Sequence, residues 1–411
     1  MQEGSQSMKT LRVSTATKKT RSKIAHEILS SGIHGPLLVV AGEHSGDLLG
    51  GDVLSHLKKL GLKEFFGTGG ETMKREGAEI IQDVESMAVM GFVDALRNYS
   101  RLHKLARDLV ALAKEKGARY ALLIDYPGFN LRIAKMLHAE GIHVIFLVSP
   151  QLWAWHHSRI HTIKKYVALM LVLFEFEKEM YEEAGVKCEF VGHPLIKRIP
   201  ERLAEEAPVA LKRVKTIGLM PGSRPSEIVK LLPAMLDAAK ILLRGYPGAR
   251  FLLPNINPKM EAYIQEQLAG VPELKVEYLK DRSLRVLEAS DAVIVASGTA
   301  TLETAYFLRP MVILYRTSWI NVILASLLMR TRMIGIVNIL ARRQVALELL
   351  QTEVTPENIA REIVRIFEDD GYRRAMVSEL EYVKRSLGSG NPAEKAARAI
   401  QTFARSTHSA R

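Results

Sequence analysis

Apolar residues occur along this chain in short β-branched runs, each followed by a small polar turn and then by apolar residues at helical spacing. The clearest runs are residues 37–40, 121–124, 216–220 and 291–296. Strands that are apolar throughout are buried on both faces, as in parallel sheets covered by helices. The pattern therefore predicts an α/β fold built from strand–turn–helix units.

The pattern stops once and then restarts, which indicates two domains. Residues 197–213 are charged and broken by prolines, and the chain of 411 residues is longer than one core usually supports. We predict two Rossmann-like parallel-sheet domains, 35–207 and 208–390, and a C-terminal helical segment, 391–411, that packs across them. Residues 1–34 carry six basic and two acidic side chains and lack the long apolar core of a secretory signal. We predict a disordered basic extension there.

Composition narrows the class of protein only slightly. Hydrophobic residues at 47% and charged residues at 25% are typical of a globular protein. Cys188 is the only cysteine, so an intrachain disulfide and a cysteine-built metal site are excluded. The formal charge of +12 indicates anionic partners, which include nucleic acid, phosphorylated metabolites and an acidic membrane. The longest apolar run, residues 319–329, is too short to span a bilayer, although it could lie in the interface.

The clearest candidate for an anion site follows the strand at 291–296. A turn of small residues precedes a predicted helix there, and the first N–H groups of a helix bind phosphate well. Glu303 falls in the first turn, where it could accept hydrogen bonds from a ribose. An ordinary β–α connection explains the same small residues. The turn consists of Ser297, Gly298, Thr299 and Ala300.

A second candidate anion site follows the strand at 216–220. Gly222, Ser223 and Arg224 precede a predicted helix, and an arginine can bind phosphate with two parallel hydrogen bonds. Further along, Asn338 ends an apolar segment and Gln351 ends a predicted short helix. Both could face a bound nucleotide.

In the first domain, polar side chains follow two predicted strands. Asp125 comes directly after residues 121–124, and apolar neighbours could raise its pKa toward that of a working base. Asn130 lies in the turn that follows. The turn after residues 37–40 offers groups for a sugar or an amine: Glu43, Ser45, Gly46 and Asp47. Glu43 and Asp47 could instead be helix-start residues. The pair His156 and His157 lacks a third ligand, so we predict no metal site.

Residues 87–96 form an unusually apolar patch followed by basic side chains. Apolar anchors beside lysine and arginine are typical of a helix on an anionic bilayer, although core packing is the alternative. The predicted membrane contacts are Val89, Met90, Phe92, Val93 and Leu96.

Eight blocks in this order and spacing resemble the lipid-A-disaccharide synthase family from about residue 37 to residue 403: AGEHSGD, VMGFVDAL, IDYPGFNLR, VSPQLWAW, FVGHPL, LMPGSRPSEI, ASGTATLE and VNILARRQVALELLQ. The resemblance implies the GT-B fold, with two Rossmann-like parallel-sheet domains facing each other across a cleft. It also implies inverting transfer of 2,3-diacylglucosamine from UDP-2,3-diacylglucosamine to 2,3-diacylglucosamine 1-phosphate. The products would be a β-1,6-linked disaccharide and UDP, formed without metal or cofactor.

The resemblance also assigns roles to the candidate residues. Asp125 stands at the family's acidic position and would be the catalytic base. The first domain would bind the acceptor and face the membrane, and the second would bind the UDP-sugar. The expected location is the cytoplasmic side of the inner membrane, without nucleic acid as a partner, and a homodimer is suggested.

Two residues depart from the family pattern, and two other functions stay open. His44 stands where a small residue is usual, and Gln344 replaces a common acid near Arg343. Another enzyme of the same architecture, such as a UDP-sugar 2-epimerase, would share the diphosphate site but would not need the apolar, basic patch. A non-catalytic nucleotide-sugar or membrane-binding module is the other alternative.

Overall fold

The computed structural model describes residues 33, 35–87, 99–152, 158–211, 213–317 and 333–408. Residue contacts divide the chain into two compact units. The first contains Met1–Leu152, Ser158–Val191 and Asn391–Arg411, and the second contains Trp153–His157 and Gly192–Gly390.

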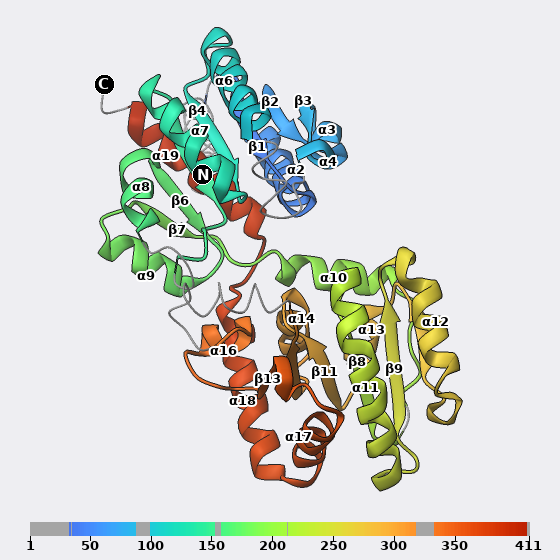
Figure 1. Ribbon diagram of the computed structural model, residues 1–411. Coiled ribbons are helices and arrows are strands. Elements are labelled where there is room, and N and C mark those ends of the chain that lie inside the picture. The colour runs from blue at the N-terminus through green and yellow to red at the C-terminus, as the bar shows by residue number, and fades with distance from the viewer. Residues whose placement is uncertain are drawn as a thin grey trace, which may run out of the picture. The chain divides into compact units, whose positions relative to one another are not determined.

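The first unit is built on a seven-stranded parallel sheet with the order β3-β2-β1-β4-β5-β6-β7 (Figure 1). Its central strands are fully buried, because helices cover the sheet, and this explains their uninterrupted apolar sequences. The strands are β1 (Leu37–Ala41), β2 (Phe65–Gly69), β3 (Ala78–Asp83), β4 (Tyr120–Ile124), β5 (His143–Leu147), β6 (Leu169–Val172) and β7 (Cys188–Phe190). The helices are α2 (His44–Lys59), α3 (Glu71–Arg75), α4 (Val84–Met87), α6 (Tyr99–Glu115), α7 (Pro127–Ala139), α8 (Arg159–Tyr166), α9 (Glu175–Glu183) and α19 (Pro392–His408).

The second unit contains a six-stranded parallel sheet with the order β10-β9-β8-β11-β12-β13. The strands are β8 (Thr216–Met220), β9 (Arg250–Asn255), β10 (Glu277–Lys280), β11 (Ala292–Ala296), β12 (Met311–Tyr315) and β13 (Glu348–Leu350). The α-helices are α10 (Leu195–Glu205), α11 (Pro225–Gly245), α12 (Glu261–Ala269), α13 (Ser283–Ala289), α14 (Thr299–Tyr306), α16 (Ile336–Ala341), α17 (Pro356–Glu368) and α18 (Asp370–Ser386). Short 3-10 turns occupy Pro258–Met260, Pro272–Leu274 and Gln351–Glu353.

Both sheets reverse their strand order at one point. Chain order runs outward from β1 to one edge and from β4 to the other, and β8 and β11 do the same in the second sheet. Ligands of open parallel sheets bind outside the carboxyl ends of the strands at such a switch point. The fold therefore marks one candidate site in each unit, after β1 and β4 and after β8 and β11.

The predicted fold class, with two parallel α/β halves, is confirmed. Two local expectations are wrong: the residues before Gln351 form the edge strand β13 and not a short helix, and Asn130 lies within α7 and not in a turn before it. Within the described residues, the structure contains no helix of the length and apolar character needed to cross a membrane.

Candidate active site

In the first unit, Glu43 and Asp125 follow adjacent strands at the switch point. Ala41 and Ile124 are paired in register across β1 and β4, so the turns after them begin side by side. Glu43 precedes α2, where its backbone is extended, and its side chain is exposed, as is that of Ser45. The structure therefore brings Glu43 and Asp125 to the same sheet edge, and Ser45 is the second residue of α2, which begins after Glu43.

Asp125 has a strained backbone held in place by a side chain. Asp125 and Tyr126 adopt φ values of 49° and 47°, in the left-handed region that residues other than glycine seldom occupy. The side-chain amide of Asn130 donates hydrogen bonds to the carbonyl oxygens of Asp125 at 2.7 Å and of Ile124 at 3.2 Å. Such strain persists only where surrounding contacts enforce it, and it is common at functional sites.

The carboxylate of Asp125 is suited to accept a proton near neutral pH. Burial and the negative charge of Glu43 together raise the pKa of Asp125 to about 6, against the opposing effect of a hydrogen bond from the backbone of Tyr126. A general base works best when its pKa lies near the working pH. Perturbed carboxylates of this kind cluster at functional sites.

Tyr126 belongs to this site, although the sequence did not single it out. A Cβ atom added to Gly42 would lie 2.3 Å from Cδ1 of the Tyr126 ring, so the ring occupies the space beside the first turn. The Tyr126 hydroxyl donates to the carbonyl oxygen of Met87 at 3.2 Å. Glycine at position 42 is the sequence signal for this close approach, but only the fold identifies the partner.

Asp47 and Asn130, two predicted sugar contacts, have buried side chains that form hydrogen bonds with the protein backbone. The Asp47 carboxylate is buried and accepts hydrogen bonds from the backbone N–H groups of Gly70 at 2.7 Å, Thr72 at 3.0 Å and Met73 at 3.1 Å. Burial raises the pKa of Asp47, but these hydrogen bonds outweigh it and lower the pKa overall. Asn130 is also fully buried. These placements favour structural roles for Asp47 and Asn130 over direct contact with a sugar.

Gly46 lies within the first turn of α2 and faces the sheet. A Cβ atom there would lie 3.3 Å from the Cβ atom of Ala41, so Gly46 allows the helix to pack closely on β1. Its predicted contact with a sugar stays a prediction.

In the second unit, a cavity of about 230 Å³ lies at the carboxyl ends of β8, β9 and β11. Eight of the ten predicted nucleotide-binding residues line it, from two turns that are far apart in sequence. They are Gly222, Ser223, Arg224, Ser297, Gly298, Thr299, Ala300 and Glu303. The sequence did not single out Arg202 or Ser283, which also line the cavity.

The wall of this cavity after β11 is the start of a helix, the kind of place where N–H groups can bind an anion. Gly298 has φ of +145°, which L side chains rarely adopt, and it directly precedes α14. The hydroxyl groups of Thr301 and Thr304 donate within the turn, to the carbonyl oxygens of Gly298 and Ala300, both at 2.7 Å. The first N–H groups of a helix point toward its start, although the N–H of Thr301 donates to the carbonyl oxygen of Gly298 at 3.1 Å.

Arg224 lies at the start of α11 on the opposite side of the same switch point. Its side chain is 76% exposed, and its Nη1 pairs with Oε1 of Glu227 at 2.7 Å. An exposed pair of this kind is weak and can be rearranged, so the guanidinium is available for a phosphate.

Glu303 is largely buried beside the cavity and faces a cation. Its Oε1 lies 3.5 Å from Nη1 of Arg202. Burial raises the pKa of Glu303, and the positive charge of Arg202 opposes this rise.

Asn338 and Gln351 are not among the residues that line the cavity. Asn338 is buried. Its side-chain amide forms hydrogen bonds with the backbone of Val345 and Ala346, and it donates to Oε1 of Glu348 at 2.7 Å. The backbone N–H of Thr317 donates a hydrogen bond to Oε1 of Gln351 at 3.3 Å. Both placements favour structural roles over the predicted contact with a nucleotide.

Several predicted features lie outside the described residues. These are the membrane contacts Val89, Met90, Phe92, Val93 and Leu96, the apolar run 319–329 and the pair His156 and His157. Within the described ranges, no three His, Cys, Asp or Glu side chains are grouped so that they could hold a metal ion.

Two Rossmann-like units, each with a site at its switch point, define the GT-B class of proteins. Solved structures of this class share the fold. The glycotransferase of kitacinnamycin aligns with a TM-score of 0.61 at 15% identity, over 90% of this chain and 99% of that one. A putative UDP-N-acetylglucosamine 2-epimerase from Listeria monocytogenes aligns with a TM-score of 0.57 at 11% identity, over 92% and 98%.

Sequence comparison identifies the family within this class. The sequence profile of lipid-A-disaccharide synthetases matches residues 37–401. The lipid-A-disaccharide synthase of Anaeromyxobacter dehalogenans strain 2CP-1 is 40% identical over 357 residues, which cover 86% of this chain and 93% of that protein. The chain belongs to the lipid-A-disaccharide synthase family and is a glycosyltransferase of the GT-B fold.

Proposed function

We propose that this protein transfers 2,3-diacylglucosamine from UDP-2,3-diacylglucosamine to 2,3-diacylglucosamine 1-phosphate. The 6-hydroxyl oxygen of the acceptor attacks the anomeric carbon of the donor, the bond to UDP breaks, and the configuration inverts. The observation that carries the proposal is the placement of Asp125, a carboxylate with a raised pKa at a switch point, in a chain of this family.

In the proposed step, Asp125 takes the proton of the acceptor hydroxyl as the new bond forms. Glu43 and Ser45, exposed beside it, contact the acceptor sugar. One carboxylate is enough, because inversion needs a single displacement and no covalent intermediate. Asp125 therefore acts as general base.

The leaving UDP is held by the second unit in this proposal. The start of α14, with Ser297, Gly298, Thr299 and Ala300, and Arg224 at the start of α11 meet the charge that develops on the diphosphate. Preorganised donors aimed at developing charge lower the barrier most effectively. Glu303 accepts hydrogen bonds from the ribose. The cavity of about 230 Å³ supports this placement, since these residues converge there.

Both substrates carry acyl chains, so we also propose that the protein acts at the cytoplasmic face of the inner membrane without crossing it. The apolar residues of 87–96, followed by Arg101, Lys104 and Arg107, would contact anionic lipid. The first unit then receives the acceptor, and the second unit receives the UDP-sugar. In this proposal a second copy of the chain forms a homodimer with the first.

The experiment is an assay of UDP release and disaccharide formation from the diacylated donor, with and without the diacylated acceptor. A synthase releases UDP only with the acceptor and forms disaccharide in equal amount. Conversion of a UDP-sugar to its 2-epimer without acceptor would replace this proposal by the epimerase alternative. UDP binding without either reaction would indicate a binding module.

A further inference from the structure

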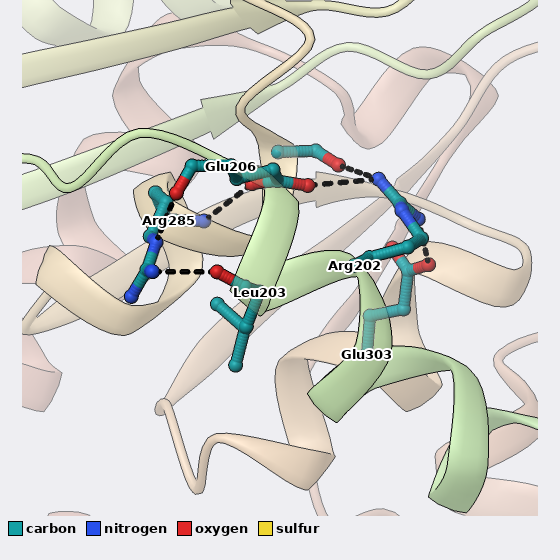
Figure 2. Close-up of polar contacts among 6 residues, drawn as sticks. Arg202, Leu203, Glu206, Arg285 and Glu303 are labelled. Carbon is teal, nitrogen blue, oxygen red and sulfur yellow. Dashed lines mark hydrogen bonds and ion pairs between the residues drawn. The ribbon is translucent and has the colours of Figure 1, made fainter.

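Arg202 of α10 connects the segment between the two predicted domains to the nucleotide cavity. Its guanidinium contacts three side chains, all within the second unit (Figure 2). Nη2 lies 3.1 Å from Oε1 of Glu206 and 3.0 Å from Oγ of Ser283, while Nη1 faces Glu303. Two contacts therefore fix the guanidinium, and its remaining edge meets the carboxylate that we assign to the ribose.

The end of α10 that carries Arg202 is anchored separately, by Arg285 of α13. Nη2 of Arg285 donates to the carbonyl oxygen of Leu203 at 2.6 Å, and Nε donates to that of Glu206 at 3.1 Å (Figure 2). The backbone N–H of Arg285 donates to Oε2 of Glu206 at 3.1 Å. A cation suits the carbonyl groups that end a helix. Arg285 thus holds the helix, whereas Arg202 reaches the cavity.

We propose that Arg202 is a positioning residue of the nucleotide site, which keeps Glu303 ionised and directed at the cavity so that both carboxylate oxygens accept hydrogen bonds from the ribose hydroxyls of UDP. This inference rests on the proposed function, because it assigns a partner to the ribose-binding carboxylate. A protonated carboxyl group would offer fewer acceptors, since one oxygen becomes a donor.

The charges around Glu303 support this role for Arg202. Burial raises the pKa of Glu303, Arg202 lowers it, and Glu206 raises it. Three other cations on or beside the elements packed against α14 have partners of their own. Arg285 of α13 pairs with Glu288, Arg343 after α16 pairs with Glu379 of α18, and Lys384 of α18 lies over the Tyr306 ring. Arg202, at 3.5 Å from Glu303, is the cation whose charge lowers the pKa of this carboxyl group.

The test compares the UDP affinity of the full-length chain and of Arg202→Gln by calorimetry from about pH 8 down to about pH 5, because the ordinary pKa of a glutamate is about 4.3 and burial raises that of Glu303. The readout is the ratio of the two Kd values at each pH, because the ionisation of UDP itself cancels. Without Arg202 the pKa of Glu303 rises further, so a larger fraction is protonated as the pH falls. We expect the ratio to increase several-fold toward low pH, and Arg202→Lys to restore most of the affinity and flatten the profile.

Arg285→Gln is the matched control, because it weakens the anchoring of α10 and leaves the charge beside Glu303. Its Kd ratio to the parent protein should not change with pH. The inference would be overturned if Arg202→Gln lost UDP affinity equally at every pH and by the same factor as Arg285→Gln. An unchanged UDP affinity of Arg202→Gln would overturn it as well. If the parent protein does not bind UDP, or if Glu303→Gln binds UDP as tightly as the parent protein does, Glu303 is not the ribose contact. That result contradicts the proposed nucleotide site itself and not only the role of Arg202.

Discussion

The side-chain amide of Asn130 donates a 2.7 Å hydrogen bond to the carbonyl oxygen of Asp125 and so supports a backbone with φ of 49°. The carboxylate of Asp125 is thereby presented at the carboxyl end of β4 in a conformation that an unsupported aspartate would seldom adopt. The proposed base, Asp125, and the side chain that supports its backbone, Asn130, are thus separate residues of one β–α connection.

Asp125→Asn should lower turnover by about 10²- to 10⁴-fold, the usual contribution of a general base. UDP affinity should be little changed, because the residues that we propose for the nucleotide lie in the second unit. Steady-state UDP release and calorimetry measure the two quantities. Turnover near that of the parent protein would exclude Asp125 as the base.

The same variant should be more stable at neutral pH. The folded pKa of Asp125 is about 6, above its ordinary value of 3.8, so the folded state binds the proton more tightly than the unfolded state. Ionised Asp125 therefore costs folding free energy above pH 6, and this cost disappears as the pH falls below 3.8. Asp125→Asn should unfold at higher temperature at neutral pH, with no such gain in acid.

The acid side of the pH–rate profile should report Asp125. As the pH falls through about 6, protonation removes the base and kcat/KM decreases. Glu43→Gln removes a negative charge that raises the pKa of Asp125, so this decrease should move to lower pH. Glu43→Asp, which keeps the charge, is the control. A shift to higher pH in Glu43→Gln would contradict the assignment.

Gly42→Ala should disturb the turn that carries Asp125. Its Cβ atom would lie 2.3 Å from the Tyr126 ring, so the ring must move together with the residue next to the base. We expect a loss of roughly 1–3 kcal/mol in unfolding free energy, as for overpacking, and reduced turnover. Gly128→Ala is the matched control, because its Cβ atom meets nothing within 4 Å. Equal effects of the two variants would show that the contact with Tyr126 is unimportant.

Arg224→Ala should weaken UDP binding by roughly 1.5–3 kcal/mol, the range for hydrogen bonds to charged groups. Its exposure and its replaceable pairing with Glu227 leave the guanidinium available for the diphosphate. Calorimetry with UDP and with uridine separates phosphate from nucleoside contacts, and only UDP should lose affinity. Lys230→Ala on α11 serves as the control. Unchanged UDP affinity would place the diphosphate elsewhere.

Combined substitution of Val89→Ser, Phe92→Ser and Val93→Ser should weaken binding to anionic vesicles while UDP binding persists. Each basic residue near an anionic surface adds about 1 kcal/mol to the free energy of membrane binding. Because salt screens this attraction, vesicle binding of the parent protein should also decrease as the salt concentration rises. Vesicle flotation measures both effects. Retained binding would move the membrane face elsewhere, and unfolding of the variant would assign these side chains to the core.

Local sequence patterns were sufficient to predict the central strands of both sheets and the turns in which most candidate site residues lie. The apolar runs predicted β1, β4, β8 and β11, because a strand buried on both faces must be apolar throughout. Most predicted nucleotide residues lie in turns that directly follow such strands, and they converge on one cavity. Asn338 and Gln351 were harder to interpret, since their polar groups meet backbone atoms that only the folded chain brings near.

By itself, the sequence determined the two α/β halves, the family and the position of Asp125 at the end of a strand, because all three depend on local order along the chain. The tertiary structure alone decided which side chains meet. It buried Asp47 among three backbone N–H groups, placed the Tyr126 ring against Gly42 and brought Arg202 to Glu303 across 101 positions of sequence. Burial and charge proximity arise only when distant segments pack together, and they set the pKa values on which the proposed chemistry depends.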